Sequence, residues 1–400
     1  MSLLPGCARC KKRGAKTHSK NTPMTHPVQL LDPRTGKRYP LLEPRWRSDD
    51  GTPLLVEALP GIGKDDVDTR TQSLWRYRAS LPLDLPKPIS LGEGCTPLVE
   101  NSWGEQRLLF KLDWISPTGS FKDKGATVMV SFLSYLGIDA ILEDSSGNGG
   151  AAIAAYGAAA GMRVRILCPE STQPAKVAQM KIFGADVRLI PGTRQDTENA
   201  ALEQASEVFY ASHNWHPFFL QGTKMTAYEI WEQLGFRAPD NVIVPVGAGS
   251  NVLGCDLGFR ELLAAGQIKK LPRIFGVQPA ACAPIKASFD AGVDELVPTE
   301  FSTTIAEGAS IRKPVRLKEV LSALRRGGGG IVSVGEDEII EALHRLAGMG
   351  LFVEPTSAIV GASLDQLYAS GRIDSGETTV ALLSGSGLKA SAFVTKLFGS

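Results

Sequence analysis

The sequence predicts an α/β protein with open, twisted and mostly parallel sheets flanked by helices. From residue 107 onward, short runs rich in β-branched residues alternate with longer segments of helical periodicity, as expected of βα units. Apolar residues make up 43% of the 400-residue chain, which is enough for a large buried core. Small-residue turns also stand between strand and helix at several points, which is the position of ligand-binding turns in such sheets.

The strands are expected to be short, and each is expected to lead its unit. They are predicted at 107–115, 140–144, 163–168, 186–190, 208–212, 241–246, 273–277 and 378–383. Helices are predicted at 122–136, 148–160, 221–234, 250–264, 336–347 and 357–370. The glycine run 327–330 precedes a strand, which favours a flexible loop over a phosphate-binding turn.

Charge and cysteine content narrow the class of protein. The chain has 43 Lys+Arg against 42 Asp+Glu, so it has no field that would attract a nucleic acid. It lacks an uninterrupted apolar stretch of the roughly 18 residues that cross a membrane, so no membrane partner is expected. Six cysteines without a framework pattern suit a reducing compartment. We therefore expect a cytoplasmic enzyme.

The first 31 residues differ in composition from the rest. They hold six basic residues, no acidic residue and no periodicity, which predicts a disordered basic tail. A mitochondrial transit peptide is also basic, but it needs an amphipathic period that is missing here. Cys7 and Cys10 form one C-x-x-C, yet the second pair of a zinc ribbon does not follow at the usual spacing. No metal site is expected.

Two of the turns are suited to an anion. Residues 145–150 follow the strand at 140–144, and residues 247–251 follow the strand at 241–246. Backbone amides at the start of a helix bind anions, and glycines allow a ligand to come close. Neither turn matches G-x-G-x-x-G, so a dinucleotide-dependent oxidoreductase is only a minor alternative. A single such turn would favour a plain strand-to-helix connection, whereas two favour ligand binding.

A third turn, at 116–125, opens a helix with two lysines. The helix dipole and burial both favour the neutral amine at Lys122 or Lys124, and a neutral amine is what Schiff-base chemistry needs. Because the two residues are two positions apart, only one can enter a given pocket. Residue chemistry alone still favours a surface lysine.

Four segments, in this order, resemble the tryptophan-synthase-β-like (fold type II) family of pyridoxal-phosphate enzymes. They are 120–125, 145–149, 247–251 and 384–389. Within the family the sequence is most similar to the threonine synthases, through 74–78, 90–98 and 352–358. The resemblance runs from about residue 40 to the end of the chain.

The resemblance implies two α/β domains with the cofactor between them, and a homodimer. A degenerate ribbon-like segment at 32–60 would precede an N-terminal arm of the large domain at 61–124. A small mobile domain would follow at 125–218, and the rest of the large domain at 219–400. Closure of the small domain would exclude water from the site.

The resemblance also implies roles for individual residues. Lys122 corresponds to the lysine that binds the cofactor aldehyde and moves the substrate proton, and Asn148 to the partner of the ring 3-hydroxyl. Ser384 corresponds to the residue facing the pyridine nitrogen, which a serine does not keep protonated. The cofactor phosphate would lie on Gly247, Ala248, Gly249, Ser250 and Asn251, and the amino-acid substrate on Ser145, Ser146, Gly147 and Ser212.

The implied activity is that of a carbon–oxygen lyase that converts O-phosphohomoserine and water to threonine and phosphate. Phe219, however, stands where the family has an arginine for the substrate phosphate, and Ala248 where it has an asparagine. His213, His216 or Lys224 could supply a replacement for this arginine.

The segment 304–308, with Arg312, resembles the serine/threonine dehydratases instead. An ammonia-lyase or β-replacement enzyme acting on a β-substituted amino acid without phosphate is therefore the alternative. A non-catalytic relative that binds the cofactor is a third hypothesis. Retention of Lys122, Asn148 and Ser384 argues against it.

Overall fold

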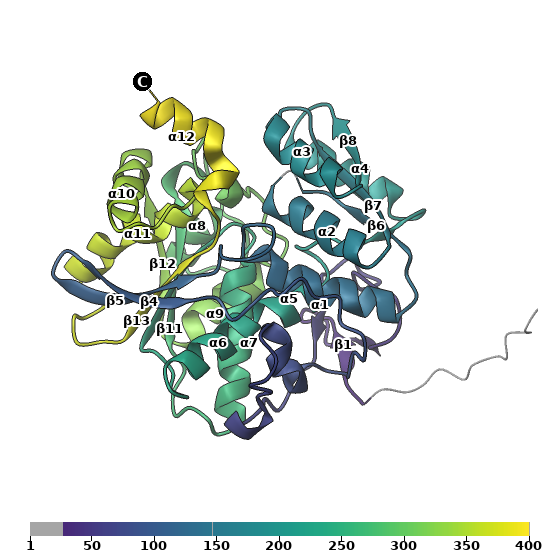
Figure 1. Cartoon of the computed structure of the whole chain (residues 1–400), viewed down its shortest axis with the longest axis horizontal. Helices are drawn as coiled ribbons and strands as arrows, with labels where there is room; N and C mark the ends of the chain where they lie inside the picture. Colours follow the sequence, from purple (N-terminus) through teal and green to yellow (C-terminus); the bar gives the residue numbers. More distant parts are fainter. Residues whose placement is uncertain (1–26, 146, 400) are drawn as a thin grey trace, which may run out of the picture.

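The computed structural model describes residues 27–145 and 147–399, which form two parallel-dominated sheets and one small antiparallel sheet (Figure 1). The six-stranded sheet has the order β12-β11-β10-β13-β5-β4, and only the β4–β5 pair is antiparallel. Its strands are β4 (Leu98–Trp103), β5 (Gln106–Leu112), β10 (Asn241–Pro245), β11 (Arg273–Pro279), β12 (Gly330–Val334) and β13 (Thr379–Leu383). This architecture confirms the α/β prediction.

The second sheet is parallel throughout and has the order β8-β7-β6-β9. Its strands are β6 (Ala140–Glu143), β7 (Arg163–Pro169), β8 (Asp186–Ile190) and β9 (Phe209–Tyr210). Every residue of β10 and β13 in the larger sheet is buried, as is typical of parallel strands covered by helices on both faces.

The helices cover both larger sheets. They are α1 (Lys122–Tyr135), α2 (Asn148–Ala159), α3 (Pro174–Ile182), α4 (Arg194–Gln204), α5 (Pro217–Thr223), α6 (Met225–Gln233), α7 (Ser250–Ala264), α8 (Pro284–Asp290), α9 (Leu317–Arg326), α10 (Glu336–Gly348), α11 (Pro355–Ala369) and α12 (Ser391–Phe398). Figure 1 shows α2, α3 and α4 with the four-stranded sheet, and α10 and α11 with the six-stranded sheet. In the described part of the chain, none of these helices is long and apolar enough to cross a membrane.

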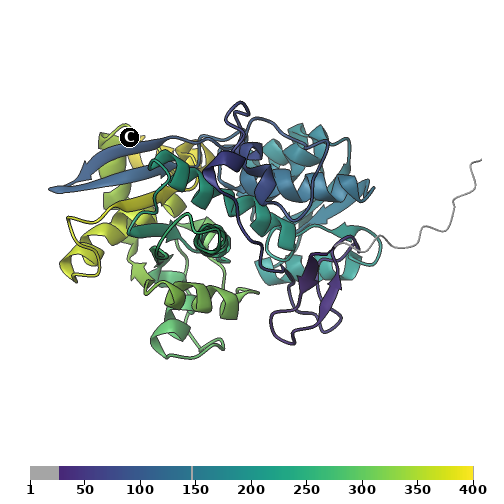
Figure 2. The ribbon, with the colours of Figure 1, turned by 90° about the horizontal axis from the view of Figure 1, so that it is seen from below.

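A short antiparallel sheet of β1 (Gln29–Leu31), β2 (Arg38–Pro40) and β3 (Leu55–Val56) lies at the end of the molecule that carries the four-stranded sheet (Figure 2). The sequence predicts a disordered tail up to residue 31, but residues 29–31 form β1. The reason is that Leu30 is buried and pairs with Tyr39 and Val56. Residues 1–26, which include Cys7 and Cys10, lie outside the described residues.

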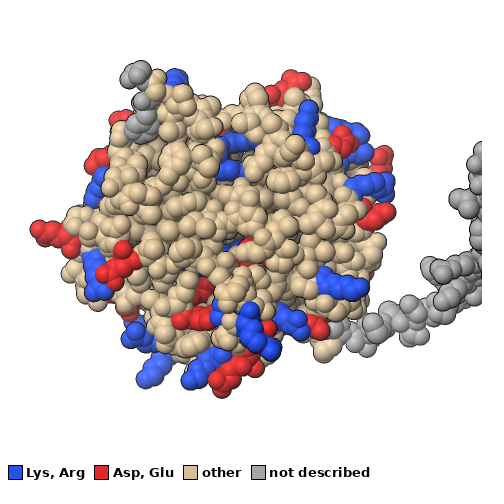
Figure 3. All heavy atoms as spheres, viewed as in Figure 1, with Lys and Arg blue, Asp and Glu red and all other residues tan. Residues whose placement is uncertain are grey.

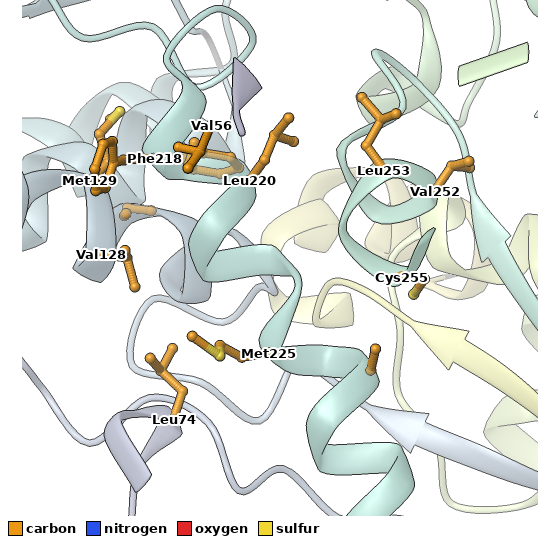
Figure 4. Close-up of a cluster of buried hydrophobic side chains, with 14 of the residues drawn as sticks. Val56, Leu74, Val128, Met129, Phe218, Leu220, Met225, Val252, Leu253 and Cys255 are labelled. Atoms are coloured by element: carbon orange, nitrogen blue, oxygen red, sulfur yellow. The ribbon is translucent and has the colours of Figure 1, made fainter. Parts of the chain in front are cut away.

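The largest apolar core joins segments that are far apart in the sequence (Figure 4). Val56 of β3, Val128 and Met129 of α1, Phe218 of α5 and Val252 of α7 belong to this one buried cluster. The core therefore fixes the start of α1 relative to the start of α7. The expected helix at 221–234 is two helices, α5 and α6, that meet at Lys224. The Lys224 ammonium is buried there, on Ser80 O (2.7 Å) and Glu261 Oε1 (2.8 Å).

Candidate active site

A cavity of about 1030 Å³ brings together the segments that the sequence singled out. Lys122, both anion-ready turns and Ser384 line it. The turns at 145–149 and 247–251 follow β6 and β10, and Ser384 follows β13 directly. Each therefore lies at the carboxyl end of a parallel strand, where open α/β sheets bind ligands.

Lys122 is the first residue of α1, and its side chain reaches the cavity. The Phe121 amide donates to Ser384 O at 2.9 Å, which ties the start of the helix to the end of β13. The Nζ atom lies 4.6 Å from the centroid of the Phe121 ring and 5.5 Å from that of Phe219. Burial lowers the pKa of Lys122 to about 8, although Glu143 and Glu354 oppose the shift. A substantial fraction of this amine is neutral near pH 8, and a neutral amine is nucleophilic.

Lys124 lies in a different environment although it is only two residues away. Its Nζ atom is fully buried, 2.8 Å from Asp113 Oδ1 and 3.0 Å from Glu229 Oε2. Burial opposes its charge, but these two carboxylates outweigh burial and raise the pKa of Lys124. Lys124 is therefore a charged structural residue, and Lys122 alone of the two lines the cavity.

The turn at 247–251 forms a close-fitting cradle. Gly249 has φ +96, and a Cβ there would come within 2.2 Å of Val320 Cγ2. A Cβ at Gly247 would come within 2.7 Å of Gly308 O. No side chain caps α7, which begins at Ser250, so its first amides remain available to an anion. Ala248 lines the cavity with a methyl group, which cannot supply the hydrogen bonds of the asparagine that the resemblance led us to expect there.

The second anion-ready turn leads into α2. Gly147 is the N-cap of this helix, and no side chain caps it. Asn148 Nδ2 donates to Glu354 Oε1 at 2.9 Å, so the residue expected to face the ring hydroxyl also contacts a buried carboxyl. Burial raises the pKa of Glu354. Ser145 lines the cavity, whereas Ser146 lies outside the described residues.

Two site residues were missed by the sequence reasoning. Ser357 Oγ accepts the amides of Ser384 (2.9 Å) and Gly385 (2.7 Å), and lies 3.1 Å from Ser384 Oγ. It therefore fixes the hydroxyl predicted to face the ring nitrogen. Glu354 is the other missed residue. Both residues lie in the segment 352–358, and the similarity of this segment to the threonine synthases was the one feature of the sequence that pointed to them.

Ser212 and Phe219 do not line the cavity. Ser212 is fully buried and donates to Asp144 Oδ1 at 3.2 Å, while the next two residues, His213 and Asn214, do line the cavity. Phe219 is fully buried against α1, where a Cβ on Gly125 would come within 2.5 Å of its ring. The substrate-binding role predicted for Ser212 stays a prediction.

The residues present fit the expected cofactor, pyridoxal phosphate. The cavity offers an amine with a lowered pKa for the aldehyde, an uncapped glycine cradle for the phosphate and a fixed hydroxyl for the ring nitrogen. Lysine or arginine side chains are visible in the notch between α12 and α3 (Figure 3). The cavity is lined by more basic than acidic side chains: Lys122, Lys176, Arg194, Arg312, Lys389 and Lys396 against Glu307, Glu336 and Glu354. An anionic ligand is thus favoured.

One family model and several known proteins match most of this chain. The family model described as "Pyridoxal-phosphate dependent enzyme" matches residues 89–385. The threonine synthase of Methanocaldococcus jannaschii is 36% identical over 337 residues, covering 82% of this chain and 83% of the relative. That of Mycobacterium tuberculosis is 34% identical and covers 78% of this chain and 87% of the relative.

Solved structures share the fold. A threonine deaminase from T.th. superposes with a TM-score of 0.60 at 25% identity, covering 73% of this chain and 92% of that one. A maize serine racemase gives a TM-score of 0.64 at 20% identity, covering 76% and 92%.

Proposed function

We propose that this chain, which belongs to the pyridoxal-phosphate-dependent enzyme family, converts O-phosphohomoserine and water into threonine and phosphate. The observation that carries the proposal is the identity of 34–36% to curated threonine synthases over about four fifths of both chains. Pyridoxal phosphate is the cofactor of the family, and when bound it withdraws electrons from the substrate α-carbon. The chain's own residues must then bind the substrate, move its protons and admit water.

Lys122 is the residue proposed to hold the cofactor and to transfer protons. Its amine is positioned at the start of α1, and its lowered pKa keeps part of it in the form that accepts a proton at Nζ. Gly247, Ala248, Gly249, Ser250 and Asn251 would bind the cofactor phosphate, and Ser384 the ring nitrogen. The turn that begins with Ser145 would bind the substrate carboxylate at the start of α2.

The cavity carries positive charge even though Phe219 stands where the resemblance led us to expect an arginine. Lys389 lines the cavity and its Nζ contacts Thr118 O and Gln179 Oε1, so within the described residues it has no carboxylate in direct contact. Arg312 lines the cavity as well, 5.5 Å from the Phe301 ring. These cations support a substrate that carries a phosphate.

A dehydratase is the second candidate function. The apolar Phe219 and the 25% identity to a threonine deaminase structure favour it. The two functions separate in one experiment with the purified holoenzyme: phosphate release from O-phosphohomoserine against 2-oxo-acid formation from serine, threonine and 3-hydroxyaspartate. Phosphate release coupled to threonine formation supports the first. Efficient 2-oxo-acid formation from a hydroxy amino acid, without phosphate release, supports the second.

A cytoplasmic homodimer remains part of the proposal. Size-exclusion chromatography with light scattering would give the oligomeric state, and fractionation of the producing cells would give the location.

A further inference from the structure

His213 lies on the cavity wall, and its Nε2 atom has no partner in the described part of the chain. Among the described residues, His213 hydrogen-bonds to Glu143: its backbone amide donates to Oε2 (3.1 Å), and Nδ1 lies 3.0 Å from Oε1. Because Glu143 occupies Nδ1 and His213 lines the cavity, Nε2 is left for other partners. It is therefore the ring nitrogen that a molecule in the cavity can reach.

The imidazole ring contacts the proposed carboxylate-binding turn and also the aromatic ring that lies beside the proposed reactive amine. On one side it packs on Gly149, where a Cβ would come within 2.7 Å of the imidazole Cε1. On the other side its centroid lies 5.6 Å from that of Phe219, the ring whose centroid is 5.5 Å from Lys122 Nζ. His213 thus faces the space between the carboxylate-binding turn and the reactive amine.

Glu143 orients the histidine. It is the last residue of β6, and His213 follows β9, the neighbouring parallel strand, so both lie at the same sheet edge. Glu143 is fully buried and also accepts the Asp144 amide at 3.1 Å. These contacts leave the imidazole one orientation, with Nδ1 toward the carboxyl and Nε2 toward the cavity.

We propose that His213, oriented by Glu143, removes a proton from the water molecule that adds to the substrate. The inference rests on the proposed function, in which the water oxygen becomes the hydroxyl of threonine. The water oxygen supplies the electron pair of the new bond to the substrate β-carbon as one of its O–H bonds breaks. The double bond left between the α- and β-carbons by loss of phosphate opens at the same time, and its electron pair moves toward the α-carbon. The proton passes to Nε2, Nδ1 gives its proton to the Glu143 carboxylate, and the pair later releases one proton to solvent.

The charges around the pair support this proton path. The groups that face it are Lys122 from α1, Asp144 from the end of β6 and Arg194 from α4. Burial and the Lys122 charge hold the pKa of His213 well below its usual value, which disfavours a charged ring. Burial and Asp144 raise the pKa of Glu143, so the carboxylate holds a transferred proton more firmly, whereas the His213 and Asp144 amides and the Arg194 charge favour its ionised form before the transfer. Both pKa shifts favour an imidazole that accepts a proton at Nε2 and gives one up from Nδ1 without becoming charged.

The first test measures how the reaction divides between products. Wild type, His213→Gln and Glu143→Gln holoenzymes receive O-phosphohomoserine, and phosphate, threonine and 2-oxobutyrate are all measured. Substrate that loses phosphate without gaining the hydroxyl leaves as 2-oxobutyrate and ammonia. General-base catalysis contributes about 10²–10⁴-fold, so threonine per phosphate should fall at least ~10-fold in His213→Gln, with 2-oxobutyrate making up the difference. A parallel fall in phosphate and threonine at an unchanged ratio would overturn the inference.

His216→Asn is the matched control. His216 lies three residues further on and is more deeply buried than His213, and it does not line the cavity, so it does not replace the missing arginine. Its Nδ1 caps α5 by accepting the Phe218 amide at 3.3 Å. Asparagine is a good N-cap, so this variant should keep the wild-type product ratio. A changed ratio in this control would mean that any buried histidine in this segment shifts the products, and would overturn the assignment to His213.

A second readout does not depend on activity. The holoenzyme is labelled with nitrogen-15 in its five histidine side chains and measured by NMR. The signal that is missing from the spectrum of His213→Gln identifies His213. We expect a neutral ring with its proton on Nδ1 near pH 7, and loss of that preference in Glu143→Gln. A charged ring, or a proton on Nε2, would contradict the inference. If the wild type releases no phosphate from O-phosphohomoserine, the proposed function fails and the inference fails with it, whereas an unchanged product ratio overturns the inference alone.

Discussion

Replacing Gly249 by alanine should disrupt the cavity at the start of α7. Gly249 has φ +96, and the Cβ of an alanine would come within 2.2 Å of Cγ2 of Val320, a fully buried residue of α9. A left-handed backbone disfavours a side chain by about 1–2 kcal/mol. Overpacking of a core adds about 1–3 kcal/mol. We therefore expect Gly249→Ala to lower the free energy of unfolding by ~2–5 kcal/mol.

The other end of the same helix supplies the matched control. Gly266 has φ +68, but its Cβ would meet nothing within 4 Å. Gly266→Ala should lose only the backbone term of about 1–2 kcal/mol. The difference between the two variants isolates the close approach to Val320.

The assay combines urea unfolding of each variant with titration of pyridoxal phosphate, followed by visible absorbance. Gly249→Ala should bind the cofactor more weakly than Gly266→Ala, because the turn that receives the phosphate must shift. Adding Val320→Ala should relieve the clash, so the double variant should be more stable than the sum of the single changes predicts, by roughly 1 kcal/mol or more. Equal stability of the two glycine variants, or strict additivity with Val320→Ala, would refute the reasoning.

The two lysines at the start of α1 differ in their surroundings, and replacing or titrating each should have a different effect. Lys122→Ala should remain folded but lose the visible absorbance that wild type gains with the cofactor, and retention of that band would exclude the lysine. The rate at which the wild-type apoprotein gains this band should rise with pH, reach half of its maximum near pH 8 and level off above that pH, because the neutral amine reacts and burial lowers the pKa of Lys122 from the ordinary 10.5 to about 8. A rate that is still rising at pH 10 would contradict this prediction. Lys124→Met should lower the free energy of unfolding by ~3–5 kcal/mol in urea, since it leaves the buried carboxylates of Asp113 and Glu229 without this countercharge; wild-type stability would contradict it.

Local chemistry in the sequence was sufficient to find the elements that carry the site. The glycine-rich turn after the apolar strand predicted at 241–246 indicated a helix start, and α7 begins there at Ser250. The turns before α1 and α2 were found in the same way. Turn and helix-start preferences act over a few residues, so one sequence suffices to read them.

Contacts between distant segments were not predictable in the same way. Asn148 meets Glu354 across 206 positions and His213 meets Glu143 across 70, so no local pattern marks either pair. Burial of Phe219 beneath α1 also depends on how α5 packs, and the sequence showed only that an arginine was missing.

The sequence by itself determined the α/β class, the anion-ready turns and the presence of two lysines at one helix start. Only the tertiary structure decided between those lysines. Lys122 and Lys124 share a helix turn and a dipole, so their local preferences are the same. What differs is the environment that packing provides: two carboxylates hold Lys124 charged, whereas Lys122 is buried beside a cavity with no carboxylate in direct contact among the described residues. The protonation state of an amine depends on the charges and burial around it, and the fold alone places those around Lys122.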